Sequence, residues 1–125
     1  STFRNVIQQA DAACQALNSP KGQQALSLLD APIHAGKNLR VTLDIGPIRE
    51  AGFLAGSGPS RMHTVHKSHG AVQTPGGGAR GVRVIIDRAP GQREIHIQTC
   101  FPLDNLPMSK YSVRDMDANM NIANG

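Results

Sequence analysis

The fold is decided by residues 82–101, which read Val82-Arg83-Val84-Ile85-Ile86-Asp87-Arg88-Ala89-Pro90-Gly91-Gln92-Arg93-Glu94-Ile95-His96-Ile97-Gln98-Thr99-Cys100-Phe101. Two runs in this stretch alternate in side-chain character with the period of two that is typical of half-buried β-strands. The residues expected on the buried face are those at 82, 84 and 86 in the first run and at 95, 97, 99 and 101 in the second. Ala89-Pro90-Gly91-Gln92 lies between the two runs and predicts a turn, so the stretch predicts an antiparallel hairpin. The second face of this hairpin is polar enough to line a binding surface, since it carries Arg83, Asp87, Glu94, His96 and Gln98.

The chain before and after the hairpin predicts the remaining elements. Residues 2–18 carry apolar side chains at helical spacing, with Gln9 and Asp11 expected on the exposed side of that helix. Ser19-Pro20 begins a second helix, and residues 39–45 alternate as another strand. A last strand is expected around residues 111–114. Helices followed by strands predict an α+β fold, with two N-terminal helices packed on a curved antiparallel sheet of about four strands.

The length of 125 residues predicts a single domain with one core. We expect a helical part over residues 1–36, a sheet with the active-site segment over 37–115, and a flexible tail over 116–125. Residues 48–54 fit either a short helix or a strand. No apolar run approaches the ~20 residues that a membrane span needs, so no span is expected. The chain begins without Met, and we expect it to be a fragment of a longer protein.

The distribution of charge points to a polyanionic partner. The formal net charge is +4, and the stretch from Arg61 to Arg93 has Asp87 as its single acid. Its basic residues are Arg61, Lys67, Arg80, Arg83, Arg88 and Arg93. A basic segment of this kind is typical of proteins that bind RNA or DNA, although a solvated surface gives the same pattern.

The segment Arg61-Met62-His63-Thr64-Val65-His66-Lys67-Ser68-His69-Gly70 holds three of the five histidines of the chain. Histidine exchanges protons near neutral pH, so it can serve as general acid, general base or metal ligand. RNA cleavage through the 2′-hydroxyl needs a base, an acid and a cation that stabilises the charged phosphorane. The segment therefore favours metal-free RNA cleavage without a cofactor. We expect the catalytic set to be His63, His66, Lys67, His69 and Thr99. The expected substrate-binding set is Arg61, Arg83, His96, Gln98 and Phe101.

Two other classes of function remain open. The three histidines could hold a metal in a nuclease, but the nearby Arg61 and Lys67 repel a dication, and no cysteine lies near them. A non-catalytic nucleic-acid-binding module is the other alternative, although an aromatic content of 3% disfavours binding by base stacking. The glycine-rich run 74–79 lacks the Gly-Lys-Ser/Thr ending of a phosphate loop, so we expect a lid or linker there. Cys14 and Cys100 are far apart in sequence, and we expect buried free thiols.

The order of elements and the ending Thr99-Cys100-Phe101-Pro102 resemble the small α+β ribonucleases of the barnase, EndoU, colicin and RelE superfamily. EndoU-like members place catalytic histidines and a Lys before a late strand that ends in Thr-x-Tyr-Pro, and here Phe101 stands where Tyr would be. Many such domains are C-terminal toxins of contact-dependent growth inhibition and other polymorphic toxin systems. The resemblance implies an endoribonuclease that cleaves RNA, with tRNA the expected substrate, and a cognate immunity protein. It also implies export on a larger secreted or cell-surface protein, and action in the cytoplasm of a target bacterium.

Overall fold

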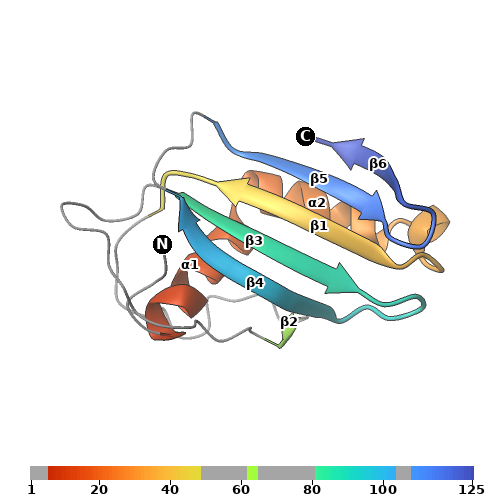
Figure 1. Ribbon diagram of the computed structural model, residues 1–125, viewed down its shortest axis with the longest axis horizontal. Helices are drawn as coiled ribbons and strands as arrows, with labels where there is room; N and C mark the ends of the chain where they lie inside the picture. The colour runs from red at the N-terminus through yellow and green to blue at the C-terminus, as the bar shows by residue number, and fades with distance from the viewer. Residues whose placement is uncertain (1–5, 49–61, 65–80, 104–107) are drawn as a thin grey trace.

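A computed structural model describes residues 6–48, 62–64, 81–103 and 108–125. The chain forms α1 (Val6–Asn18), α2 (Pro20–Asp30) and a short 3-10 helix η1 (Pro32–His34). Six strands make one sheet in the order β2-β4-β3-β1-β5-β6, and both helices cover one face of it (Figure 1). The strands are β1 (Leu39–Ile45), β2 (Met62–Thr64), β3 (Gly81–Arg88), β4 (Ile95–Leu103), β5 (Lys110–Asp115) and β6 (Met120–Asn124). This arrangement confirms the α+β fold with N-terminal helices on an antiparallel sheet.

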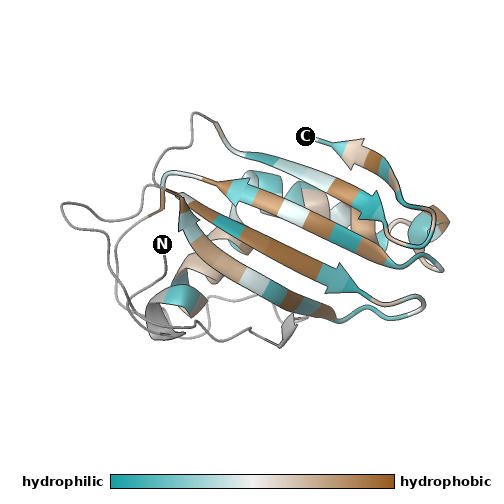
Figure 2. Ribbon diagram, in the orientation of Figure 1, coloured by the Kyte–Doolittle hydropathy of each residue, from teal (hydrophilic) through white to brown (hydrophobic). Residues whose placement is uncertain are grey.

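The core lies between the helices and the sheet, because one face of β1, β3 and β4 is mainly apolar. Figure 2 shows the alternation along β1, where Leu39, Val41, Leu43 and Ile45 are all buried. The last three of these pair with the buried Ile86, Val84 and Val82 of β3. The helices complete this layer with small and branched apolar residues, namely Ala12, Ala13, Ala16, Leu17, Ala25, Leu26 and Leu29.

The two helices approach each other closely at a single glycine. Ser19 caps α2, since its hydroxyl accepts a hydrogen bond from the backbone N–H of Gly22 at 3.1 Å. A Cβ at Gly22 would lie 2.2 Å from the carbonyl oxygen of Ala16 and 2.7 Å from that of Leu17. Glycine is therefore required for the tight turn that brings α2 back along α1. None of the helices in the described ranges is long and apolar enough to cross a membrane.

Three sequence-based expectations about the elements need correction. Within the described residues the sheet has six strands, where about four were expected. The additional strands are β2, which pairs in parallel with β4, and β6, which pairs with β5. Residues 116–125, expected as a flexible tail, instead form the turn after β5 and the strand β6. Gln9 and Asp11 of α1, expected on the exposed side, are only 1% and 2% exposed. The reason for Gln9 is a long-range contact, since its Nε2 donates to the carbonyl oxygen of Cys100 at 2.8 Å.

A β-bulge in β4 changes which side chains face the core. The register places Ile85 opposite Thr99 and Ile86 opposite Ile97, so Gln98 is the extra residue of β4. Simple alternation would put Thr99 and Phe101 on the buried face with Ile97. The bulge moves both to the face away from the helices and turns Cys100 toward the core, where it is 3% exposed. Because one extra residue reverses every side chain beyond it, the composition of the candidate site depends on this bulge.

Arg88, at the end of β3, lies on the helix side of the sheet and is 3% exposed. Its guanidinium donates to the carbonyl oxygens of Leu29, of His34 at 2.6 Å and of Lys37 at 2.9 Å. The carbonyl of Leu29 lies in the last turn of α2, and those of His34 and Lys37 follow the helix, where helical hydrogen bonding has ended and backbone oxygens need other donors. Arg88 therefore joins the end of α2 and the connection into β1 to the sheet.

Candidate active site

The open face is defined here as the side-chain layer of β1, β3, β4 and β5 that points away from the helices, toward the viewer in Figure 1. Residues paired directly across antiparallel strands project to the same side, so the register arranges this face in rows. The three rows, read from β5 through β1 and β3 to β4, are Lys110–Asp44–Arg83–Phe101, Ser112–Thr42–Ile85–Thr99 and Arg114–Arg40–Asp87–His96. The face is thus mainly polar, with charged rows on either side of a neutral one.

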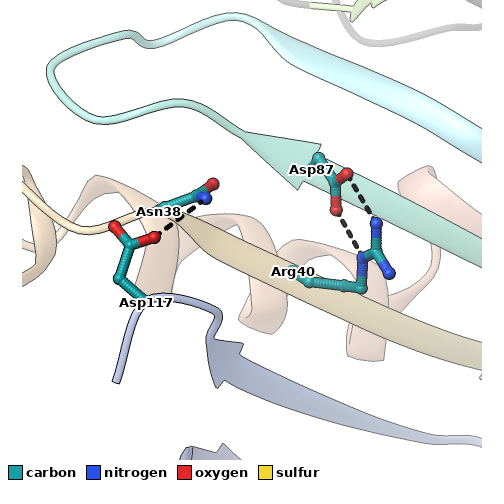
Figure 3. A network of polar contacts seen from close by, with 4 residues as sticks. All are labelled: Asn38, Arg40, Asp87 and Asp117. Atoms are coloured by element: carbon teal, nitrogen blue, oxygen red, sulfur yellow. Dashed lines mark hydrogen bonds and ion pairs between the residues drawn. The ribbon is translucent and has the colours of Figure 1, made fainter. Parts of the chain in front are cut away.

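Two ion pairs join β1 to β3 within the outer rows. Arg83 donates Nε and Nη2 to the two carboxylate oxygens of Asp44 at 2.7 and 2.8 Å. Arg40 makes the same bidentate contact with Asp87 at 2.7 and 2.9 Å (Figure 3). The two pairs run in opposite directions, because each strand contributes one arginine and one aspartate four residues apart. Bidentate pairs of this geometry are the strong form of the interaction, so they hold the centre of the open face rigid.

These pairs define the surroundings of Arg83, a member of the expected substrate-binding set. The hydrogen bond that Arg83 donates to Asp44 raises the pKa of Arg83 above its ordinary value, and the bond that Arg40 donates to Asp87 does the same for the pKa of Arg40. The Asp44 side chain is only 4% exposed, so its negative charge requires the arginine as a partner. The guanidinium of Arg83 also lies over the ring of Phe101, 5.8 Å from its centroid. Arg83 is therefore a positioned donor over the Phe101 ring, and the Asp44 carboxylate compensates its charge.

His96, expected among the substrate-binding residues, is the one histidine of the predicted site whose side chain the structure describes. It is partly exposed on the open face, directly opposite Asp87 of the Arg40–Asp87 pair. Thr99 and Gln98 are also partly exposed on β4, at the bulge. The bulge brings Thr99 to the same face as His96, so the imidazole and the hydroxyl share one face of the sheet.

The histidine segment begins beside His96. β2, which contains His63, runs parallel to β4, with Met62 opposite Ile95 and Thr64 opposite His96. The backbone of His63 thus lies in the strand that adjoins His96, as expected if the segment packs against the sheet. Arg61, His66, Lys67 and His69 lie outside the described residues, and so do the glycine-rich run 74–79 and most of the ambiguous stretch 48–54.

The described residues contain no group of three or more His, Cys, Asp or Glu side chains able to hold a metal. Two of the three histidines of the metal alternative, His66 and His69, fall outside that part of the chain. The described face offers a different chemistry: an imidazole, a hydroxyl, an amide and fixed guanidinium donors. Such groups can move a proton and orient an anionic group without a metal.

Sequence reasoning missed that Arg40 and Asp44 belong to the site. Each lies on the polar side of the predicted strand 39–45, and that strand has the order Arg-x-x-x-Asp, as does Arg83-x-x-x-Asp87. Two such strands in antiparallel register place each arginine opposite an aspartate. The sequence therefore contains a signal for these two ion pairs, but the signal can be used only when β1 is known to lie next to β3.

Both cysteines are buried and neither forms a disulfide, as expected. Burial raises the pKa of the Cys100 thiol to about 12, and the nearby Cys14 adds a smaller increase. Cys100 is therefore a protonated core residue and not a nucleophile at neutral pH.

This raised pKa predicts a loss of stability in alkali. The folded state keeps the Cys100 proton after the thiol in the unfolded chain, with its ordinary pKa of 9.0, has lost it. The free energy of unfolding should therefore fall as the pH rises from about 9 to 12, on the order of a few kcal/mol. Urea unfolding at a series of pH values measures this fall, and Cys100→Ala should show a smaller one. An equal fall in both proteins would contradict the assignment.

Comparison with models of protein families, with curated proteins and with solved structures finds no match for this chain.

Proposed function

We propose that the protein is a metal-independent endoribonuclease that binds RNA across its open face. The observation that carries the proposal is the position of His96, which lies partly exposed beside Thr99 on a polar sheet face, with the strand of His63 next to it. A second histidine from residues 63–69 would complete an acid–base pair. Sheet strands hold their side chains more rigidly than loops, which suits groups that must meet a reacting phosphate in a defined geometry.

In the proposed reaction, one imidazole takes the proton of the substrate's 2′-hydroxyl, and the oxygen attacks the adjacent phosphorus. The bond from phosphorus to the 5′-oxygen breaks, and the second imidazolium gives its proton to that leaving oxygen. The product is a 2′,3′-cyclic phosphate and a free 5′-hydroxyl. Lys67 stabilises the charged phosphorane, whereas Thr99 and Gln98 orient its oxygens. Arg83 and Phe101 form the stacked edge against which a base can lie.

The biological setting of the proposal rests on the resemblance to bacterial toxin ribonucleases. On that basis the substrate is tRNA in the cytoplasm of a target bacterium, and a cognate immunity protein blocks the open face. Delivery would depend on a larger secreted or cell-surface protein that carries this domain.

The test is incubation of the purified protein with total bacterial RNA, with and without excess EDTA, followed by a denaturing gel and mapping of the new ends. Discrete cleavage that survives EDTA and leaves 2′,3′-cyclic phosphates is the expected result. Cleavage that EDTA abolishes would replace this mechanism with a histidine-bound metal. Binding without cleavage, weakened by salt as phosphate contacts release counterions, would instead make the protein a non-catalytic RNA-binding module.

A further inference from the structure

The outer edge of β6 is a sheet edge with unusually little protection. β6 ends the strand order, and no strand in the described ranges pairs with its outer side (Figure 1). Edge strands commonly carry lysine, proline or inward-pointing charges that prevent pairing with another chain. β6 has none of these, since it reads Met120-Asn121-Ile122-Ala123-Asn124. Its one irregularity is a bulge, which the register locates at Ile122.

The hydrogen bonding beyond the bulge is regular and shows which backbone groups are available. The N–H of Gly125 donates to the carbonyl oxygen of Tyr111 at 2.9 Å, and the N–H of Tyr111 donates to that of Gly125 at 2.9 Å. In an antiparallel ladder, neighbouring residues point their backbone groups to opposite sides. The N–H and C=O of Asn124 therefore point outward, where a further strand can bond to them.

The exposed charged residues at the two ends of the β5–β6 hairpin are opposite in sign, and at the turn end the partly exposed Arg114 donates to the backbone of Asn119. The turn between the strands carries Asp115 and the exposed Asp117, whose carboxylate accepts from Asn38 at 3.5 Å (Figure 3). The other end carries the exposed Lys110. If two copies of this edge pair antiparallel, the acidic end of each meets the basic end of the other. Parallel pairing would instead bring like charges together, which is unfavourable.

Exposed apolar side chains show the same complementarity. Among the described residues, three large hydrophobic side chains are exposed, and two of them lie in or next to this hairpin: Met120 at 54% and Met108 at 71%. Met120 lies at the acidic end, and Met108 lies just before β5 at the basic end. Antiparallel pairing of two copies brings Met120 of each copy to the end that holds Met108 of the other, where both can lose contact with water.

We propose that two copies of this chain associate through β6, antiparallel about a two-fold axis perpendicular to the sheet. The edge is complementary to itself. The two β6 strands at the centre are uncharged, and opposite charges and exposed methionines meet at each end. Such a contact is isologous, so every interaction occurs twice. The axis keeps the helices of both copies on one side, and the two open faces form one continuous surface on the other. This inference does not depend on the proposed ribonuclease activity.

Analytical ultracentrifugation over a wide range of protein concentration tests the association, with a monomer–dimer equilibrium as the expected result. Asp117→Lys alone and Lys110→Asp alone should each raise the dissociation constant about fivefold or more, because two symmetric charge pairs turn repulsive. The double variant Lys110→Asp/Asp117→Lys should restore the wild-type constant, since each pair is then re-formed with its signs exchanged. Gln24→Lys, at an exposed position of α2, adds a positive charge away from the edge and should leave the dimer unchanged.

A variant of the strand itself separates backbone pairing from the charges. Asn124→Pro removes the outward N–H and should abolish the dimer, and circular dichroism checks that the fold is retained. Should this variant fail to fold, the charge-exchange series remains sufficient. A wild-type protein that stays monomeric at every concentration, or a double variant that binds no better than the single ones, would overturn the proposal.

Discussion

His96→Gln is expected to lower the rate of RNA cleavage by about 10²- to 10⁴-fold, the loss typical when a general acid or base is removed. Glutamine keeps a polar side chain of similar reach on the open face, but it cannot exchange a proton. His96 is partly exposed on a paired strand of the sheet and makes no contribution to the apolar core. The free energy of unfolding should therefore stay within about 0.5 kcal/mol of the wild-type value, as for surface substitutions.

The matched control is His34→Gln, which removes the other histidine that the structure describes with its side chain. His34 lies on η1, before β1, and its Nδ1 is 3.4 Å from Nζ of Lys37. The cleavage rate of this variant should equal that of the wild type. In addition, the pH dependence of kcat for His96→Gln should lose one limb, which a merely structural role would not change. Equal rates for His96→Gln and the wild type would remove His96 from the reaction.

Arg88→Met is expected to lower the free energy of unfolding by about 3–5 kcal/mol, a large fraction of the total for a domain of this size. Methionine matches the length of the arginine stem, so the loss reports on the hydrogen bonds more than on packing. The carbonyl oxygens of Leu29, His34 and Lys37 would lose the guanidinium that now donates to them. Urea unfolding followed by circular dichroism measures the change.

The control for this prediction is Arg93→Met, in the exposed turn between β3 and β4. It removes the same charge and should change the free energy of unfolding by no more than about 0.5 kcal/mol. If both variants unfold at the same urea concentration, the buried arginine does not hold α2 to the sheet.

The sequence by itself determined the class of fold and most of its elements. Apolar residues at a period near 3.6 up to residue 30, and at a period of two in 39–45 and 81–88, reflect burial on one face of each element. Burial on one face is a local requirement, so it leaves a local pattern. The residues that the pattern assigned to the polar side of β1 and β3, such as Arg40, Asp44, Arg83 and Asp87, do lie there.

Only the tertiary structure decided which of these residues meet. The Arg83–Asp44 pair depends on β1 lying beside β3, and the buried position of Gln9 depends on a carbonyl 91 residues away in the chain. The bulge at Gln98 brings Thr99 and Phe101 to the face of His96, against the simple alternation of the sequence. Neither residues 116–125 nor 62–64 show a strong period of two, and the strands that they form, β6 and β2, lie at the two edges of the sheet. Pairing with a neighbouring strand makes them strands, and that neighbour is chosen by long-range contacts that no local pattern records.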